Sequence, residues 1–323
     1  MKDLMALINF LKKEDYFYIQ THNFPDHDAV ASAYGLQYLF KTYNLKSYLV
    51  YEGEIQRDSL RMMIKELGID IKPIQEYDMK PTDKIIIVDG CKGNKNVTDL
   101  IGDEIAVIDH HQVSKPDDVK FADIRPNYGS CSTIIFSYYI MLKKEMPKEI
   151  ATALLIGLNM DTSLLTRGVS EEDIGAYSYL YSLSNYRLVN SILRNYIQQK
   201  DLQFYKEAIE NIKIENELAF CYFPEGCNQN LLGILGDFFL ALKEVDFVVL
   251  CAKNENNINF SIRSENEKLN ASQIIQIVLN GIGFGGGHSD MAGGIIKEAK
   301  LFDEDKIFKK FLETVNKFRM GEE

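Results

Sequence analysis

The sequence contains few of the residues that stabilise small secreted proteins. Its 323 residues include five cysteines, an odd number spread over the chain without a CxxC pair: Cys91, Cys131, Cys221, Cys227 and Cys251. Such spacing argues against a disulfide framework and against a zinc ribbon. We therefore expect reduced thiols, most of them buried.

The chain also lacks net positive charge and long apolar runs. Its 36 Lys and Arg residues face 47 Asp and Glu residues, so the formal net charge is −11. Because affinity for long nucleic acid comes from cationic surface, this charge argues against a protein that coats duplex DNA. No apolar run is long enough for a signal peptide or a membrane span. Residues 1–13 instead have leucines at helical spacing, which predicts an amphipathic helix of a cytoplasmic protein without a membrane partner.

Histidine is equally scarce, and its five copies are clustered. His22 and His27 lie in THNFPDHDAVAS, His110 and His111 in VIDHH, and His288 in GFGGGHSD. Histidine and carboxylate side chains bind divalent metals and transfer protons near neutral pH. Their confinement to Asp-rich or Gly-rich segments therefore indicates one assembled catalytic site.

The patterns that are present predict an α/β fold. In the first half we expect strands at 16–20, 46–51, 84–88 and 104–108, and helices at 29–43 and 58–67. The run KIIIV at 84–88 is typical of a parallel strand that is covered on both faces. From residue 130 to about 209 the pattern is helical, and no glycine or proline occurs between Gly175 and Pro224, which predicts a helical connection between two domains.

A second, smaller α/β unit is expected after this connection. We predict strands near 212–222, 246–252 and 257–263, helices near 229–243, 271–279 and 304–318, and a glycine-rich turn before the last helix. The predicted domains are residues 1–190, a helical connector over 191–210, and residues 211–323.

Each polar cluster of the first half falls at the carboxyl end of a predicted strand. His22 follows the first strand, Asp89 follows 84–88, and Asp109 follows 104–108. In open α/β sheets that edge is where ligands bind. A single Asp at a strand end is more often a turn residue or a helix N-cap, but three such clusters in one chain argue for a shared site. With Asp26, Asp28 and Asp161 added, the side chains suffice for two divalent ions that share a bridging carboxylate.

These motifs resemble those of the DHH phosphoesterase superfamily, in the branch of nanoRNases and 3′-phosphoadenosine 5′-phosphate phosphatases. The first motif of that superfamily, of HxNPDGDAxGS type, corresponds to residues 22–32, the second to Asp89-Gly90, the third to Asp109-His110-His111 and the fourth to Asp161-Thr162.

The resemblance implies a role for each matching residue. His22 and Asp26 would bind one metal, Asp28, His110 and Asp161 the other, and Asp89 would bridge them. His111 would face the substrate phosphate as a catalytic residue, and Asp109 would orient the histidines. The metal implied is manganese, although these ligands also suit magnesium, cobalt or iron.

Gly285-Gly286-Gly287-His288, preceded by Arg263-Ser264, looks like the substrate-binding signature of a DHHA1 domain. Glycines let backbone N–H groups approach an anion, and Arg263 and His288 can donate hydrogen bonds to it. The implied architecture is an N-terminal DHH domain with a mainly parallel sheet, a helical connection and a smaller DHHA1 domain, with the active site in the cleft between them.

Three residues depart from this pattern or lie beside it. His27 stands where the superfamily commonly has glycine, and we expect its side chain to point outward rather than to bind metal or phosphate. Arg125 and Arg167 are candidate phosphate contacts, for which surface salt bridges are the favoured interpretation.

The expected substrates are short oligonucleotides, linear dinucleotides such as pApA, and 3′-phosphoadenosine 5′-phosphate. The alternatives are a RecJ-like single-strand exonuclease, an enzyme that opens cyclic dinucleotides and, with less support, a pyrophosphatase or a nucleotide-binding regulator without activity. Base preference, RNA against DNA, cleavage polarity and a homodimeric state stay open at this point.

Overall fold

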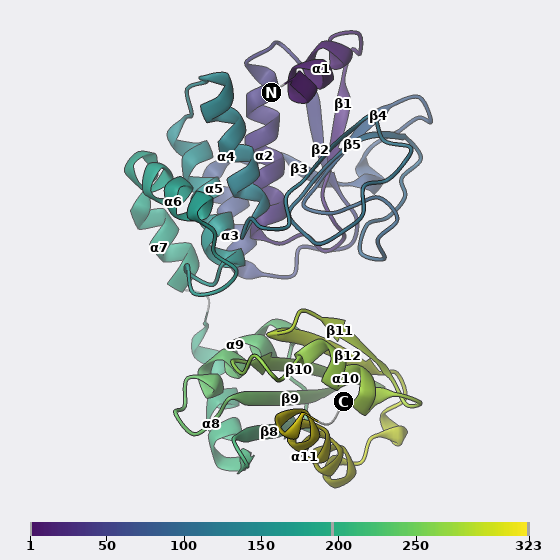
Figure 1. Ribbon diagram of the computed structural model, residues 1–323, viewed down its shortest axis with the longest axis vertical. Coiled ribbons are helices and arrows are strands. Elements are labelled where there is room, and N and C mark those ends of the chain that lie inside the picture. Colours follow the sequence, from purple (N-terminus) through teal and green to yellow (C-terminus); the bar gives the residue numbers. More distant parts are fainter. Residues whose placement is uncertain (1, 195–196, 322–323) are drawn as a thin grey trace. The chain divides into compact units, whose positions relative to one another are not determined.

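The computed structural model describes residues 2–194 and 197–321, and the chain divides into two compact units, Met1–Tyr196 and Ile197–Glu323 (Figure 1). The boundary falls inside the predicted connector 191–210. Among the described residues, no helix combines the length and the apolar character that a membrane span requires. The first unit contains these elements: α1 (Lys2–Leu11), β1 (Phe17–Gln20), α2 (His27–Lys41), β2 (Ser47–Tyr51), α3 (Asp58–Leu67), β3 (Ile71–Pro73), η1 (Ile74–Glu76), β4 (Lys84–Val88), β5 (Asp103–Asp109), β6 (Phe121–Ile124), α4 (Cys131–Leu142), α5 (Lys148–Asp161), α6 (Glu171–Leu183) and α7 (Tyr186–Arg194).

The first unit is built on one parallel sheet with the strand order β3-β2-β1-β4-β5-β6. The order reverses between β1 and β4, which makes that pair the topological switch point of the sheet. A large core joins one face of the sheet to α1, α2, α4 and α5, which pack beside it (Figure 1). A smaller core around Ile85, Ile87 and Val107 covers the other face under the segments that flank β4 and β5. The predicted mainly parallel sheet is confirmed.

The second unit holds a mixed six-stranded sheet with the order β11-β12-β10-β9-β8-β7, in which only the β8–β9 pair is parallel among the described pairings. Helices α10 and α11 pack on one face around Phe260 and Phe311, and α8 and α9 pack on the other around Leu232 and Phe239. Its elements are η2 (Gln199–Asp201), α8 (Leu202–Asn211), β7 (Lys213–Glu215), β8 (Leu218–Phe223), α9 (Gln229–Leu240), β9 (Phe247–Asn254), β10 (Asn257–Ser264), α10 (Ala271–Leu279), β11 (Phe284–Gly287), β12 (Met291–Ile296), η3 (Ala299–Leu301) and α11 (Glu304–Met320).

Two predictions of local structure need correction. The connector is not one continuous helix, because Ile197 and Gln198 belong to no helix; residues 195 and 196 of the predicted connector lie outside the described residues. The glycine-rich segment is not a turn either. Phe284–Gly287 forms β11, which pairs antiparallel with β12, and the turn itself is formed by the residues between these strands.

Candidate metal centre

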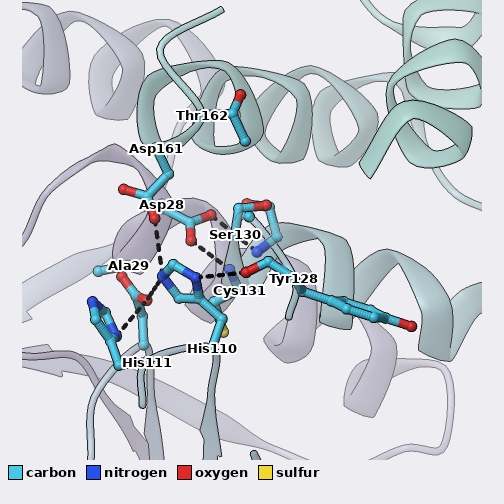
Figure 2. Close-up of polar contacts among 12 residues, drawn as sticks. Asp28, Ala29, His110, His111, Tyr128, Ser130, Cys131, Asp161 and Thr162 are labelled. Atoms are coloured by element: carbon cyan, nitrogen blue, oxygen red, sulfur yellow. Dashed lines mark hydrogen bonds and ion pairs between the residues drawn. The ribbon is translucent and has the colours of Figure 1, made fainter. Parts of the chain in front are cut away.

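The polar clusters meet where the strand order of the parallel sheet reverses. His22 follows β1 and Asp89 follows β4, and these two strands are neighbours. Asp109 ends β5, which pairs with β4, so His110 and His111 follow at the same edge. Figure 2 shows that Asp161, from the end of α5, contacts His110. Asp28, from the first turn of α2, lies in the same group of ligand atoms.

Ligand atoms of these residues gather into three overlapping groups. In each group the nitrogen and carboxylate oxygen atoms lie within 4.8 Å of one another. Asp89 belongs to two groups and His110 to two, so neighbouring groups share a residue. The groups are His22 with Asp26 and Asp89, Asp28 with His110 and Asp161, and Asp89 with His110 and His111.

The first motif folds so that both of its carboxylates also hold helix termini. Asp26 is the N-cap of α2, and its Oδ1 accepts hydrogen bonds from the amides of Asp28 and Ala29 at 3.0 and 3.1 Å. A helix cap and a metal ligand are therefore compatible roles for this side chain. The amides of Cys131 and Ser132 at the start of α4 donate to Asp28, so the N-termini of α2 and α4 both face these carboxylates, and their dipoles stabilise negative charge there.

Two histidines have their ring protons fixed by backbone carbonyls. His22 Nδ1 lies 2.9 Å from the carbonyl oxygen of Asn23, and His110 Nδ1 lies 3.1 Å from that of Tyr128 (Figure 2). A carbonyl can only accept, so each Nδ1 must carry the proton. In the neutral ring, Nε2 is then a lone-pair donor, which is the usual arrangement of a metal-binding histidine.

These Nε2 atoms face carboxylates. His110 Nε2 lies 2.9 Å from Asp161 Oδ2 and 3.4 Å from Asp89 Oδ1, and His22 Nε2 lies 3.7 Å from Asp89 Oδ2. A lone pair directed at a carboxylate is repulsive unless a proton or a metal cation lies between them.

The pKa values of His22, His110 and Asp28 are all shifted in the direction that favours the protonated form, which reduces the net negative charge of the cluster. Burial opposes protonation of His22, but the carboxylates of Asp26 and Asp89 outweigh it and raise the pKa of His22 to about 10. Burial is likewise overcome at His110, where Asp161 and Asp89 raise the pKa well above its usual range. For Asp28, burial and then the charges of Asp89 and Asp161 raise the pKa. A divalent cation would relieve the same repulsion.

The buried atoms of Asp89 support a cation here. The residue is only 2% exposed, and its Oδ1 accepts no hydrogen bond from the described residues. A buried carboxylate oxygen without a donor is costly unless it binds a metal or a proton. The backbone of Asp89 has a φ of 55°, a left-handed conformation uncommon for a non-glycine residue. Mixed carboxylate and imidazole ligands suit divalent manganese among other metals, so the residues present fit such an ion.

Asp109 is buried behind His111 and accepts hydrogen bonds from it. The carboxylate is fully buried, and its Oδ1 accepts from the His111 Nδ1 at 2.7 Å and from the His111 amide at 3.1 Å. Burial opposes ionisation of Asp109, but His111 outweighs it and lowers its pKa. The side chain of His111 is 33% exposed. Asp109 therefore holds the partly exposed His111 through two hydrogen bonds, one to its ring and one to its amide.

The segment after Asp161 adopts an uncommon backbone. Ser163, Leu164 and Leu165 all have φ between 48 and 63°, and the amides of Thr166 and Arg167 both donate to the carbonyl of Thr162. Thr162 is fully buried and its hydroxyl accepts from the Leu165 amide at 3.1 Å. The threonine of the fourth motif thus anchors a left-handed turn directly behind Asp161.

Sequence reasoning missed Gly157, although it shapes the centre. A methyl group on Gly157 would lie 2.7 Å from Asp28 Oδ1 and 2.4 Å from Ser132 Oγ. The missing side chain lets α5 approach close enough for Asp161 to meet His110. A signal was available, because a glycine inside a helical pattern usually has a packing reason.

The prediction that His27 points outward is wrong. His27 is fully buried, and neither ring nitrogen has a hydrogen-bond partner among the described residues. Burial, and then the positive charge of Arg57, lower its pKa to about 4, so the ring is neutral at pH 7. The first residue of α2 faces inward because the helix begins two residues before the predicted start at Ala29.

The two arginines near the centre make local contacts. Arg125 pairs with Asp123 through Nη2 and Oδ2 at 2.7 Å, the ion pair favoured from the sequence. Arg167 donates hydrogen bonds to the hydroxyl of Ser163 inside the left-handed turn.

Among the predicted substrate residues of the second unit, Arg263 and Ser264 are buried in the sheet, whereas His288 is exposed. The side chain of Arg263 is only 9% exposed, and its Nε lies 2.7 Å from Asp237 Oδ1. Its Nη1 also donates to the carbonyl of Ile262 at 2.9 Å. Ser264 is buried at the end of β10, and His288 is exposed just after β11.

Steric contacts require glycine at two of the three glycine positions of β11. A methyl group on Gly285 would lie 2.7 Å from Ile275, and Gly287 has a φ of 148° and would meet the Met291 carbonyl at 2.4 Å. Gly286 has room, since its nearest atom would be 3.8 Å away. Because β11 is the edge strand of its sheet, part of its backbone N–H groups lies outside the ladder.

Two domain families match the chain in sequence order. The family described as "DHH family, N-terminal domain" matches residues 16–158, and the DHHA1 domain family matches residues 215–318.

Individual proteins are similar over nearly the whole chain. The uncharacterized protein MJ1633 of Methanocaldococcus jannaschii is 28% identical over 92% of this chain and 63% of its own length. The cyclic-di-AMP phosphodiesterase PdeA of Listeria monocytogenes is 25% identical over 93% of this chain and 48% of its own length. The chain therefore spans less than two thirds of these relatives. The crystal structure of an exopolyphosphatase-related protein from Bacteroides fragilis has the same fold, with a TM-score of 0.82 at 18% identity over 98% of this chain and 96% of that chain.

The sheet topology, the four motifs at its switch point and the two matched domain families agree with one another. The chain belongs to the DHH phosphoesterase superfamily and contains an N-terminal DHH domain followed by a DHHA1 domain.

Proposed function

We propose that this protein is a metal-dependent phosphoric ester hydrolase that acts on short nucleotides. One observation carries the proposal: the groups His22-Asp26-Asp89 and Asp28-His110-Asp161 lie side by side, and Asp89 Oδ1 is 3.4 Å from His110 Nε2. These distances support the role that the resemblance implies, in which Asp89 would bridge two divalent ions. Two such ions supply charge stabilisation at a phosphoryl group and lower the pKa of bound water.

The reaction is hydrolysis at phosphorus. An oxygen of water forms the new P–O bond, the bond from phosphorus to the leaving oxygen breaks, and the proton that water loses is balanced by one on the leaving group. Burial opposes protonation of His111, but Asp109 raises its pKa, so its imidazolium form can donate a hydrogen bond to a phosphate oxygen. Asp109 keeps the ring in the required orientation.

The favoured substrates are oligonucleotides of a few residues, linear dinucleotides such as pApA, and 3′-phosphoadenosine 5′-phosphate. The net charge of −11 supports a compact substrate over a long polymer. In the DHHA1 domain, the edge strand β11 and His288 can donate to a phosphate. The fixed guanidinium of Arg263 supplies positive charge in the same domain. That these groups act together with the metal ligands stays a prediction.

A cyclic dinucleotide is the second candidate, because the similarity to the cyclic-di-AMP phosphodiesterase covers 93% of this chain. At 25% identity, and with only 48% of that relative covered, the similarity favours testing this substrate and does not assign it.

Turnover on a matched panel tests the proposal. The panel contains pApA, 3′-phosphoadenosine 5′-phosphate, a cyclic dinucleotide, a long single strand and pyrophosphate, each with manganese and with EDTA. We expect metal-dependent release that is fastest on the two small linear nucleotides. Faster cleavage of the long strand would favour a RecJ-like exonuclease, and affinity would then grow with chain length and fall with salt. No metal-dependent turnover on any substrate would leave a nucleotide-binding regulator.

A further inference from the structure

Phe24 lies in the first motif but is neither a candidate metal ligand nor a core residue. It lies two residues from both His22 and Asp26, which places its Cα within about 7.6 Å of theirs. The residue is 52% exposed, and its φ is 53°. The superfamily motif has asparagine at this position, a residue that tolerates this left-handed conformation, whereas bulky side chains rarely adopt it.

Neighbouring loops impose this backbone conformation. The amide of Phe24 donates to the carbonyl of Glu52 at 2.9 Å, and the amide of Asn23 donates to that of Asn96 at 2.7 Å. The Asn23 side chain in turn accepts from the amide of Thr98 at 3.1 Å. The segment is therefore held on both sides, and a strained residue that is held in this way is characteristic of functional sites.

The ring of Phe24 rests against a residue without a side chain. A methyl group on Gly53 would lie 2.9 Å from both Cδ1 and Cε1 of Phe24, and Gly53 itself has a φ of 86°. Contact with this glycine fixes the ring while about half of the side chain stays accessible. In the described part of the DHH domain, the other strongly exposed aromatic side chains, Tyr179, Tyr181 and Tyr186, lie on α6 and α7.

The segment that carries Gly53 also brings positive charge. Arg57 follows four residues later at the start of α3, is exposed, and acts electrostatically on both Asp26 and His27. An aromatic surface and a cation therefore both border the His22–Asp26 side of the metal centre. A nucleobase and a phosphate of one nucleotide match these two groups.

We propose that Phe24 stacks on the nucleobase of the substrate and makes the site select nucleotides over phosphate esters that lack a base. This inference rests on the proposed function. Stacking of a base on an aromatic ring tolerates different bases, because every base offers a flat π surface. The contact thus favours nucleotides as a class and does not choose among bases.

The test compares a nucleotide with its base-free counterpart. KM and kcat are measured with manganese on 3′-phosphoadenosine 5′-phosphate and on the abasic sugar with the same two phosphates. The variants are Phe24→Asn, Phe24→Tyr, which keeps the ring, and Tyr186→Asn, which removes a similarly exposed aromatic side chain from α7. Phe24→Asn should fold, since asparagine favours the existing backbone, and an unchanged or higher Tm checks this.

We expect Phe24→Asn to raise KM for the nucleotide about tenfold, within the range that stacking supplies, and to leave its kcat within about threefold. KM for the abasic substrate should not change, Phe24→Tyr should restore the low KM, and Tyr186→Asn should match the wild type. An unchanged KM for the nucleotide, or an equal rise for both substrates, overturns the inference while the hydrolase stands. If the wild type hydrolyses neither substrate, the proposed function fails and the inference falls with it.

Discussion

Asp28 binds the N-terminus of a helix that begins more than one hundred residues later in the chain. Its Oδ2 accepts from the amide of Cys131 at 2.6 Å, and its Oδ1 accepts from the amide of Ser132 at 2.9 Å (Figure 2). The first motif is thereby fixed to α4, which follows the third motif. One carboxylate links two of the segments that supply the metal centre.

Replacing Asp28 by asparagine should destabilise the metal-free protein. Asparagine replaces one of the two accepting oxygens by an NH2 group, which cannot accept, so one of the two backbone N–H groups is left buried without a partner, at a cost of about 1 to 3 kcal/mol. Urea unfolding in EDTA measures the loss. Ser130→Ala, which removes only the N-cap contact to Thr133 of the same helix, should cost about 1 kcal/mol and is the comparison. Equal stability of Asp28→Asn and the wild type would contradict the proposed anchoring.

Gly157→Ala and Gly175→Ala should have opposite effects. Both glycines lie inside helices, α5 and α6. A methyl group on Gly157 collides with Asp28 and Ser132, whereas nothing lies within 4 Å of one on Gly175. We expect Gly157→Ala to lower the unfolding free energy by about 1 to 3 kcal/mol and to weaken manganese binding. Gly175→Ala should stabilise by up to about 1 kcal/mol through helix propensity. If Gly157→Ala raised the unfolding free energy as Gly175→Ala does, the close approach of α5 to Asp28 would not be needed for stability.

Asp109→Asn should reduce turnover without removing the metal. Loss of the charged acceptor of His111 Nδ1 frees the ring orientation, and changes of this kind typically cost about 10 to 100-fold. The measurement is kcat with manganese, alongside metal affinity. Asp103→Asn makes the same exchange at the exposed start of the same strand and should leave kcat unchanged. The positioning role is refuted by equal kcat in both variants.

The cysteines should resist alkylation in the native protein. All five are free and buried, as the sequence predicted for most of them. Burial, with a contribution from Glu207, raises the pKa of Cys221 and of Cys227 to about 12, so almost no thiolate exists at pH 8. Mass spectrometry after iodoacetamide treatment at pH 8 should find these two thiols unmodified, and all five modified in urea. Fast native modification of Cys227 would contradict its burial.

The same pKa shift predicts lower stability at alkaline pH. A folded-state pKa raised above the unfolded value near 8.5 contributes stability that is full below the unfolded pKa. That contribution is lost as the pH rises toward 12, because the unfolded thiols ionise first.

Sequence patterns predicted the elements that have a clear periodicity or a continuous apolar run, and the polar residues at the ends of the strands. The helix 58–67, the strand 84–88 and the helix 271–279 are found with the predicted bounds. The edge strands β3 and β6 were missed because three or four residues carry too little pattern. β11 was missed because glycine has low strand propensity, and only pairing with β12 makes Phe284–Gly287 a strand.

The sequence was sufficient to predict which residues are candidate ligands, but not how the residues around them are packed. Ligand candidates at strand ends follow from motif and topology together. The burial of His27 and the need for Gly157 depend instead on how α2 and α5 pack, which local sequence does not encode. Phe24 likewise reveals its conformation only through its contacts with Glu52 and Gly53.

The most direct test is manganese stoichiometry and turnover of Asp89→Ala, with Asp103→Ala as the control from the opposite end of the neighbouring strand. Calorimetric titration and nucleotide release are measured on the same preparations. We expect two tightly bound ions in the wild type and in the control, and loss of tight binding and of nearly all turnover in Asp89→Ala. Two bound ions and wild-type turnover in Asp89→Ala would contradict the bridging role of Asp89, and with it the proposed metal centre.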